Sequence, residues 1–145
     1  MRLHTASEVI SLIRVLENET AEFYGRLGQS APAHRDVLLG FASVNRRNVV
    51  QVQMAYNNVI SDALEGGYAF DIETTEFEFA ALKDAPIPEA LKGAVDMETK
   101  LARLYSVAGE QSRSLLPDVS RALILIARKR ETRTQKLREL LQQLP

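Results

Sequence analysis

The chain contains no cysteine, which excludes disulfides, thiol catalysis and every cysteine-based metal or iron–sulfur site. No apolar run comes near the roughly 20 residues of a membrane span. Glu8, Arg14 and Glu17 interrupt the stretch in which a signal peptide would have its apolar segment. The net charge of −1 gives no overall field that would favour nucleic acid or an anionic membrane. We therefore expect a cytoplasmic protein without a membrane partner.

The pattern of apolar residues predicts an all-α fold in one domain, residues 1–145. With 145 residues and 46% hydrophobic residues, the chain is long enough to bury a core. Four helices are expected at about 5–29, 34–64, 88–112 and from 117 almost to the C-terminus. A capping box at Thr5 and Glu8 starts the first, Gly66 and Gly67 end the second, and Pro88 and Pro117 start the others.

The spacing of these helices predicts their arrangement. The joints between the first and second helices and between the third and fourth are short, so each pair forms an antiparallel hairpin. About twenty residues, "GGYAFDIETTEFEFAALKDAPI", separate the hairpins, enough to cross the length of a bundle. Two hairpins with one long crossover are typical of the ferritin-like four-helix bundle. The hairpins also correspond to each other at offsets of 81 to 85 residues, which indicates a duplication.

On each predicted helix, residues at spacings of three and four form a stripe along one face. This stripe is apolar at its ends and polar near its middle. Because antiparallel hairpins bring these middles to a similar depth, the sequence predicts one polar cluster at the bundle centre. Its expected members are Glu17, Asn45, Asn48, Glu98, Arg130 and Arg133. The alternative is that the helical phase is wrong by one residue and these charges lie at the surface.

Two related phrases carry a family resemblance. "VLENETAEFY" (residues 15–24) and "VDMETKLARLY" (residues 95–105) each place a glutamate seven residues before a tyrosine, as Glu17–Tyr24 and Glu98–Tyr105. With the loop lengths and the duplication, the chain resembles the rubrerythrin-type branch of the ferritin-like superfamily. The resemblance implies two iron ions, held by one glutamate from each of the first and third helices. A Glu-x-x-His pair from each of the other two helices would complete the site.

The ligand set of that family is incomplete here. Glu17 and Glu98 match its single glutamates, but asparagines and arginines replace both Glu-x-x-His pairs. The replacing residues are Asn45, Asn48, Arg130 and Arg133. The only histidines, His4 and His34, lie near helix starts, and we expect them to be solvated surface residues.

We therefore predict a di-iron site that has been lost and filled with salt bridges, with no catalytic, cofactor-binding or metal-ligating residue. Arg130 is expected between Glu17 and Glu98, because a guanidinium stays ionised and can grip carboxylates. Arg133 is expected nearer Glu98. Asn45 and Asn48 are expected to hydrogen-bond to the cluster or to buried water.

The function that follows is a non-catalytic structural or partner-binding bundle. A homodimer is expected, because bundles of this family often dimerise. The crossover aromatics Phe70, Phe77 and Phe79 need cover, either on the bundle or on a second subunit. The alternative is an iron-binding oxidoreductase that handles peroxide or oxygen through Glu17 and Glu98, together with Glu22. Nucleic-acid binding is less favoured, because a basic last helix and an acidic crossover at residues 62–84 read as complementary solvated surfaces.

Overall fold

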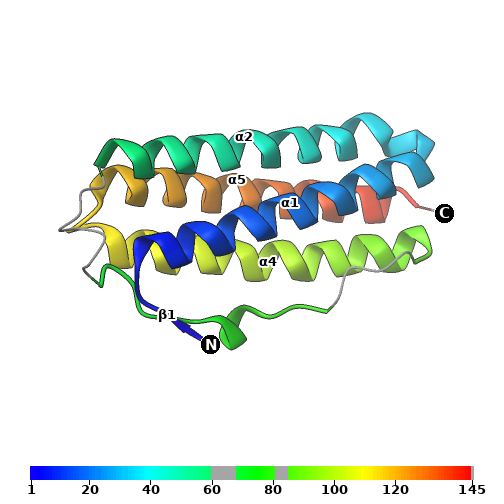
Figure 1. The fold of residues 1–145 in the computed structure, drawn as a ribbon. Helices are drawn as coiled ribbons and strands as arrows, with labels where there is room; N and C mark the ends of the chain where they lie inside the picture. Colours follow the sequence, from blue (N-terminus) through cyan, green and yellow to red (C-terminus); the bar gives the residue numbers. More distant parts are fainter. Residues whose placement is uncertain (60–67, 81–84, 145) are drawn as a thin grey trace.

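The computed structural model describes residues 1–59, 68–80 and 85–144. Four long helices make up most of these residues (Figure 1). They are α1 (Ala6–Ser30), α2 (Arg35–Val59), α4 (Ile87–Ser112) and α5 (Pro117–Gln142). The expected all-α, four-helix architecture is therefore confirmed. The expected end of the second helix near Leu64, with its stop at Gly66 and Gly67, lies outside the described residues.

The sequence signals at the helix starts act as expected. Thr5 Oγ1 accepts the amide of Glu8 at 3.2 Å, and Glu8 Oε1 accepts the amide of Thr5 at 3.0 Å. This capping box satisfies two amides that would otherwise lack a partner. Pro32 opens the short 3₁₀ helix η1 (Pro32–His34) that joins α1 to α2. Pro88 and Pro117 lie in the first turns of α4 and α5, where a missing amide proton costs nothing.

The helices pair as two hairpins. In Figure 1, α1 and α2 run antiparallel, as do α4 and α5, and these are the two closest helix pairs. The hairpins meet where α2 packs on α5 and α1 approaches α4. Because α2 and α4 run in the same direction, their connection has to return along the bundle (Figure 1).

The described part of this crossover lies outside the bundle and is fixed by the N-terminus. Strand β1 (Arg2–Leu3) pairs antiparallel with β2 (Ile72–Glu73), and the 3₁₀ helix η2 (Thr74–Phe77) packs on α4. Arg2 Nη1 lies 2.6 Å from Asp71 Oδ1. This two-stranded sheet was not expected from the sequence, because two-residue strands carry no periodic signal.

The crossover aromatics are covered by the chain itself. Phe70 and Phe77 are buried in the core and Phe79 packs against it. They therefore give no reason for a second subunit. His4, expected to be simply solvated, is half-buried and stacks on Tyr68 with 4.8 Å between ring centres. This contact forms because the N-terminal strand brings His4 beside the start of the crossover.

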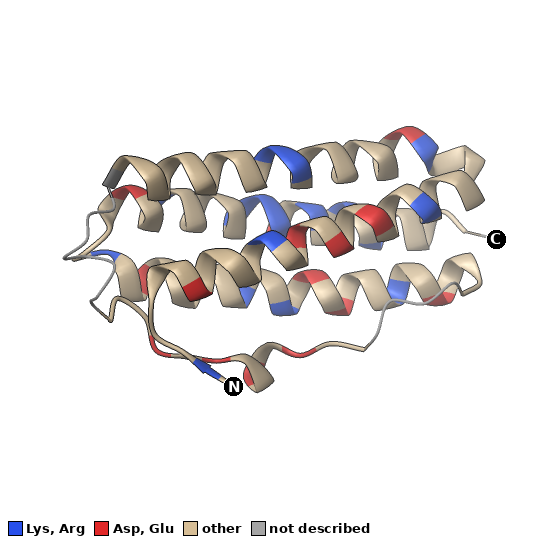
Figure 2. Cartoon of the chain, in the orientation of Figure 1, with Lys and Arg blue, Asp and Glu red and all other residues tan. Residues whose placement is uncertain are grey.

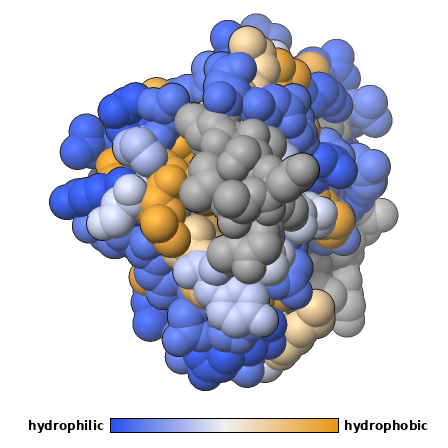
Figure 3. Space-filling model, turned by 60° about the vertical axis from the view of Figure 1, so that its left-hand side comes forward, coloured by the Kyte–Doolittle hydropathy of each residue, from blue (hydrophilic) through white to orange (hydrophobic). Residues whose placement is uncertain are grey.

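Figure 3 shows one face of the surface. With the end where α5 begins turned forward, it is mostly hydrophilic with scattered hydrophobic patches (Figure 3). None of the helices in the described ranges combines the length and apolarity that a membrane span requires.

The duplication reappears as one repeated helix contact. Gly28 in α1 faces Leu39 of α2, and Gly109 in α4 faces Ile124 of α5. These residues are related by the offsets of 81 and 85 seen in the sequence. A Cβ on Gly28 would lie 3.3 Å from the Leu39 side chain, but one on Gly109 would lie only 2.6 Å from Ile124 Cγ1. Glycine thus sets the close approach of α4 to α5.

We expect Gly109→Ala to lower the free energy of unfolding by about 1 kcal/mol. Overpacking costs about 1–3 kcal/mol, and the better helix propensity of alanine returns up to about 1 kcal/mol. Gly93→Ala in the same helix is the matched control, because nothing lies within 4 Å of its added Cβ. That control should be neutral or stabilising in urea unfolding. Equal stability of the two variants would contradict the close contact.

Candidate functional site

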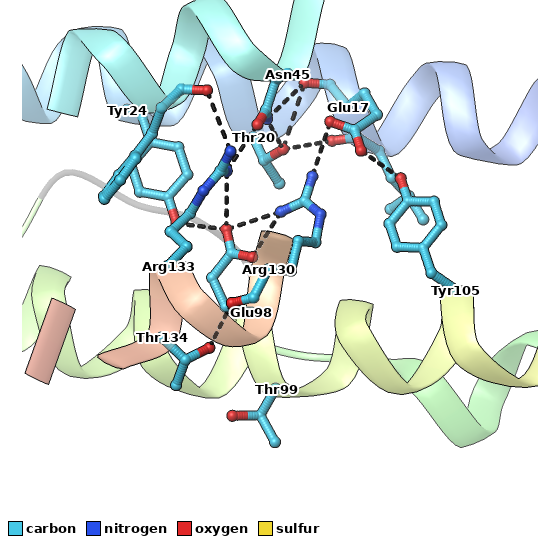
Figure 4. A network of polar contacts seen from close by, with 12 residues as sticks. Glu17, Thr20, Tyr24, Asn45, Glu98, Thr99, Tyr105, Arg130, Arg133 and Thr134 are labelled. Atoms are coloured by element: carbon cyan, nitrogen blue, oxygen red, sulfur yellow. Dashed lines mark hydrogen bonds and ion pairs between the residues drawn. The ribbon is translucent and has the colours of Figure 1, made fainter. Parts of the chain in front are cut away.

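The four helices each bring polar side chains to the middle of the bundle (Figure 4). These side chains are buried almost completely, in positions that elsewhere on the same faces hold apolar residues. They are Glu17 on α1, Asn45 and Asn48 on α2, Glu98 on α4, and Arg130 and Arg133 on α5. The structure therefore brings all six expected residues into the interior, and the alternative of a shifted helical phase is excluded for them.

Arg130 lies between the two glutamates. Its Nη1 donates to both carboxylate oxygens of Glu98 at 2.7 Å. Its Nη2 lies 2.8 Å from Glu17 Oε2, an ion pair without the angle of a hydrogen bond. One guanidinium thus joins carboxylates from α1 and α4, with no exposure of any of the three side chains to solvent.

Arg133 lies one turn further along α5 and contacts only one of the glutamates. Its Nη1 donates to Glu98 Oε1 at 3.2 Å and to Asn45 Oδ1 at 2.7 Å. Its guanidinium carbon lies 4.8 Å from the ring centre of Phe41 and 5.3 Å from that of Tyr24. Arg133 is therefore nearer Glu98, as expected, and aromatic rings on two helices hold its planar head group.

Two tyrosines complete the carboxylate contacts, and they do so across the bundle. Tyr24 on α1 donates to Glu98 on α4 at 2.6 Å, whereas Tyr105 on α4 donates to Glu17 on α1 at 2.5 Å. In the sequence, both tyrosines served only to mark the two related phrases and were given no polar role. The repeated seven-residue spacing from glutamate to tyrosine was the available signal. It puts each hydroxyl beside the carboxylate of the opposite helix.

The two asparagines behave differently. Asn45 Nδ2 donates to the Glu17 carbonyl at 3.1 Å and to Thr20 Oγ1 at 2.6 Å, so it ties α2 to α1. Asn48 is equally buried, but neither its Oδ1 nor its Nδ2 has a hydrogen-bond partner among the described residues. A bond from Asn48 to the cluster is therefore not formed, and the other expectation, a bond to buried water, stays a prediction.

The electrostatics of the cluster favour the charged forms of Glu98 and Arg130. Burial alone would raise the pKa of the Glu98 carboxyl, but the charges of Arg130 and Arg133 and the Tyr24 hydroxyl together lower it. Burial would lower the pKa of Arg130, and the two glutamates raise it instead. Burial and the neighbouring carboxylates raise the pKa of both Tyr24 and Tyr105, so their hydroxyls remain donors.

The same contacts decide whether the centre suits the two iron ions that the family resemblance implies. Both carboxylates are engaged by guanidinium nitrogens within 2.8 Å, and an arginine cannot ligate a cation. His4 and His34 lie near the helix starts, and within the described ranges no three His, Cys, Asp or Glu residues group as a metal site would require. The residues present therefore do not fit a di-iron centre.

Comparisons with known proteins give no further information about this site. No protein-family model matches the chain, and no curated protein or solved structure matches it.

We expect Arg130→Leu to lower the free energy of unfolding by about 3–5 kcal/mol, because it leaves two buried carboxylates with too little counter-charge. Adding Glu17→Gln and Glu98→Gln to the Arg130→Leu variant should recover part of the lost free energy of unfolding. Arg128→Leu, an exposed change on the same helix, should stay within about 0.5 kcal/mol of wild type in urea unfolding. If Arg130→Leu matched Arg128→Leu, the ion pairs would not support the fold.

We expect acid to destabilise the protein through Glu98. Its folded-state pKa lies below its unfolded value of about 4.3. The stabilising contribution is therefore complete above about pH 4.3 and is lost as the pH falls through the folded-state pKa. Unfolding of Glu98→Gln should depend less steeply on pH in this acid range. Parallel curves for the variant and wild type between pH 7 and pH 3 would show that Glu98 carries no such linkage.

Proposed function

We propose that this chain is a ferritin-like bundle of the rubrerythrin type that has lost its di-iron centre. In this proposal it acts as a structural or partner-binding protein rather than as an enzyme. The observation that carries the proposal is the position of Arg130, whose guanidinium occupies the space between Glu17 and Glu98. In the family that the sequence resembles, glutamates at these two positions would help to hold the iron ions.

The arrangement of the helices supports the ferritin-like part of the proposal. In two antiparallel hairpins, α2 and α4 point the same way, and the described part of the connection between them runs along the outside (Figure 1). This order of directions is the one-crossover form of the four-helix bundle. The exchange of tyrosine hydroxyls between α1 and α4 adds an approximate two-fold relation between the hairpins.

The chemistry of the cluster supports a non-catalytic role. The formal charges of two glutamates and two arginines cancel, and the carboxylates have hydrogen-bond donors from three helices. A permanently charged guanidinium offers neither a redox centre nor a proton for acid–base chemistry near neutral pH. The competing interpretation, an iron-dependent oxidoreductase, needs Arg130 to leave both carboxylates so that a metal can enter.

We expect the wild-type protein, purified from iron-rich medium, to contain no stoichiometric iron by elemental analysis. A restored variant tests the ancestry directly. It carries Asn45→Glu, Asn48→His, Arg130→Glu and Arg133→His, which together rebuild both Glu-x-x-His pairs. This variant should bind about two iron ions per chain, because the four helices would then supply the ligand set that ferritin-like bundles use.

The matched control is the restored variant with Glu98→Ala, which removes one carboxylate and should lose most of the iron. Helical circular dichroism checks that each variant folds. Stoichiometric iron in the wild type that disappears in Glu17→Ala would overturn the proposal and support the oxidoreductase. A folded restored variant without iron would argue against the di-iron ancestry.

A further inference from the structure

Two grooves of opposite charge lie on the surface. The first, here called the acidic groove, has a volume of about 470 Å³ and lies between α1 and the η2 segment. Its apolar floor is formed by Leu12, Leu16, Phe77, Phe79 and Leu104. Its acidic side chains are Glu19, Glu22 and Glu78, against one arginine, Arg26.

The second, here called the basic groove, has a volume of about 550 Å³ and lies between α2 and α5. Phe41 and Val44 form apolar parts of its wall, and the almost fully buried Arg133 reaches its base. Its outer cations are Arg47, Lys129 and Lys136, and none of its lining residues within the described ranges is acidic. Lys136 also pairs at 3.5 Å with Glu139, which does not line the groove.

The two grooves face away from each other. Both α1 and α5 neighbour α2 and α4, so the side formed by α1 and α4 is opposite the side formed by α2 and α5. Figure 2 shows basic residues gathered midway along α2 and α5, and acidic residues along α1 and the crossover. The small net charge of the chain therefore hides two oppositely charged faces.

Exposed apolar side chains adjoin the charges on both faces. On α1, Val15 is 51% exposed and precedes Glu19 by one helical turn. Val50 on α2 is 56% exposed and follows Arg47 by one turn, and Leu125 on α5 is 49% exposed and precedes Lys129 by one turn. Apolar area surrounded by charged residues is what a protein–protein interface needs, because the apolar area supplies burial and the charges select the partner.

We propose that the occupant of each groove is a second copy of this chain, joined through unlike faces. The α5 wall of one copy, with Leu125 and Lys129, enters the acidic groove of the next. The α1 wall of that copy, with Val15 and Glu19, enters the basic groove in return, as helix ridges pack into grooves. Three acidic side chains then meet three basic ones, and the apolar floor of the acidic groove and the apolar wall of the basic groove are covered.

The symmetry of such a contact sets the size of the assembly. Because the two contacting faces differ, a dimer leaves one acidic and one basic groove free at its ends. The association then continues until a ring closes or a filament forms. The inference rests on the proposed partner-binding role. It does not depend on the loss of the metal centre, which iron analysis tests separately.

The test is the mass of the protein by light scattering across micromolar concentrations at low and high salt. The monomer has a mass of 16.2 kDa. We expect the mass to rise with concentration at low salt, and the association to weaken about tenfold or more when salt screens the rim charges. A particle of monomer mass at every concentration and salt level overturns the proposal.

Variants with reversed charges test which faces of the two copies are in contact. One variant carries Arg47→Glu and Lys129→Glu, and the other carries Glu19→Lys and Glu22→Lys. Each alone should be monomeric, because each has two faces of the same sign. Their equimolar mixture should associate again, because the acidic groove of the first variant fits the basic groove of the second.

The control carries Lys92→Glu and Arg138→Glu, two exposed positions outside both grooves that change the net charge by the same amount. It should associate like wild type, and circular dichroism confirms that all three variants fold. If this control also becomes monomeric, or if the mixture of the exchanged variants stays monomeric, the assigned faces are wrong.

Discussion

The guanidinium group of Arg130 holds together the two carboxylates that the bundle buries. Without it, Glu17 and Glu98 would be like charges in an environment that water cannot screen. With it, α1, α4 and α5 are joined at one point, and Arg133 and Asn45 extend the connection to α2. The polar centre therefore fixes how the two hairpins are placed relative to each other. Apolar packing, which is less directional, fills the space on either side.

The duplication of the hairpin is preserved in some contacts and broken in others. The glutamates, the tyrosines and the helix-contact glycines occur in both halves, and the tyrosine hydroxyls are exchanged between them. At the positions that face these glutamates, however, the first half supplies the amides of Asn45 and Asn48 and the second half supplies two cations. Each half of the repeat thus supplies one buried carboxylate, whereas both arginines that neutralise them come from α5.

Interior and exterior charges have different consequences. Inside, equal numbers of glutamates and arginines cancel, so the centre can be buried without an unpaired charge. Outside, acidic side chains lie beside apolar ones on the α1 side, and basic side chains lie beside apolar ones on the α2 and α5 side. A bundle whose centre is occupied by its own arginines has these surfaces left for recognition.

The sequence by itself determined the helices and which residues share the bundle centre. Capping residues and helix-start prolines mark local geometry, and spacings of three and four place Glu17, Glu98 and Arg130 on inward faces. The expected replacement of the metal ligands also placed Arg130 between the two glutamates and Arg133 nearer Glu98. The tertiary structure decided the remaining partners. Tyr24 bonds the glutamate of the opposite helix, Asn48 finds no protein partner within the described residues, and residues 2–3 pair with 72–73. Such choices depend on distances between segments far apart in the chain, which periodicity within one helix does not encode.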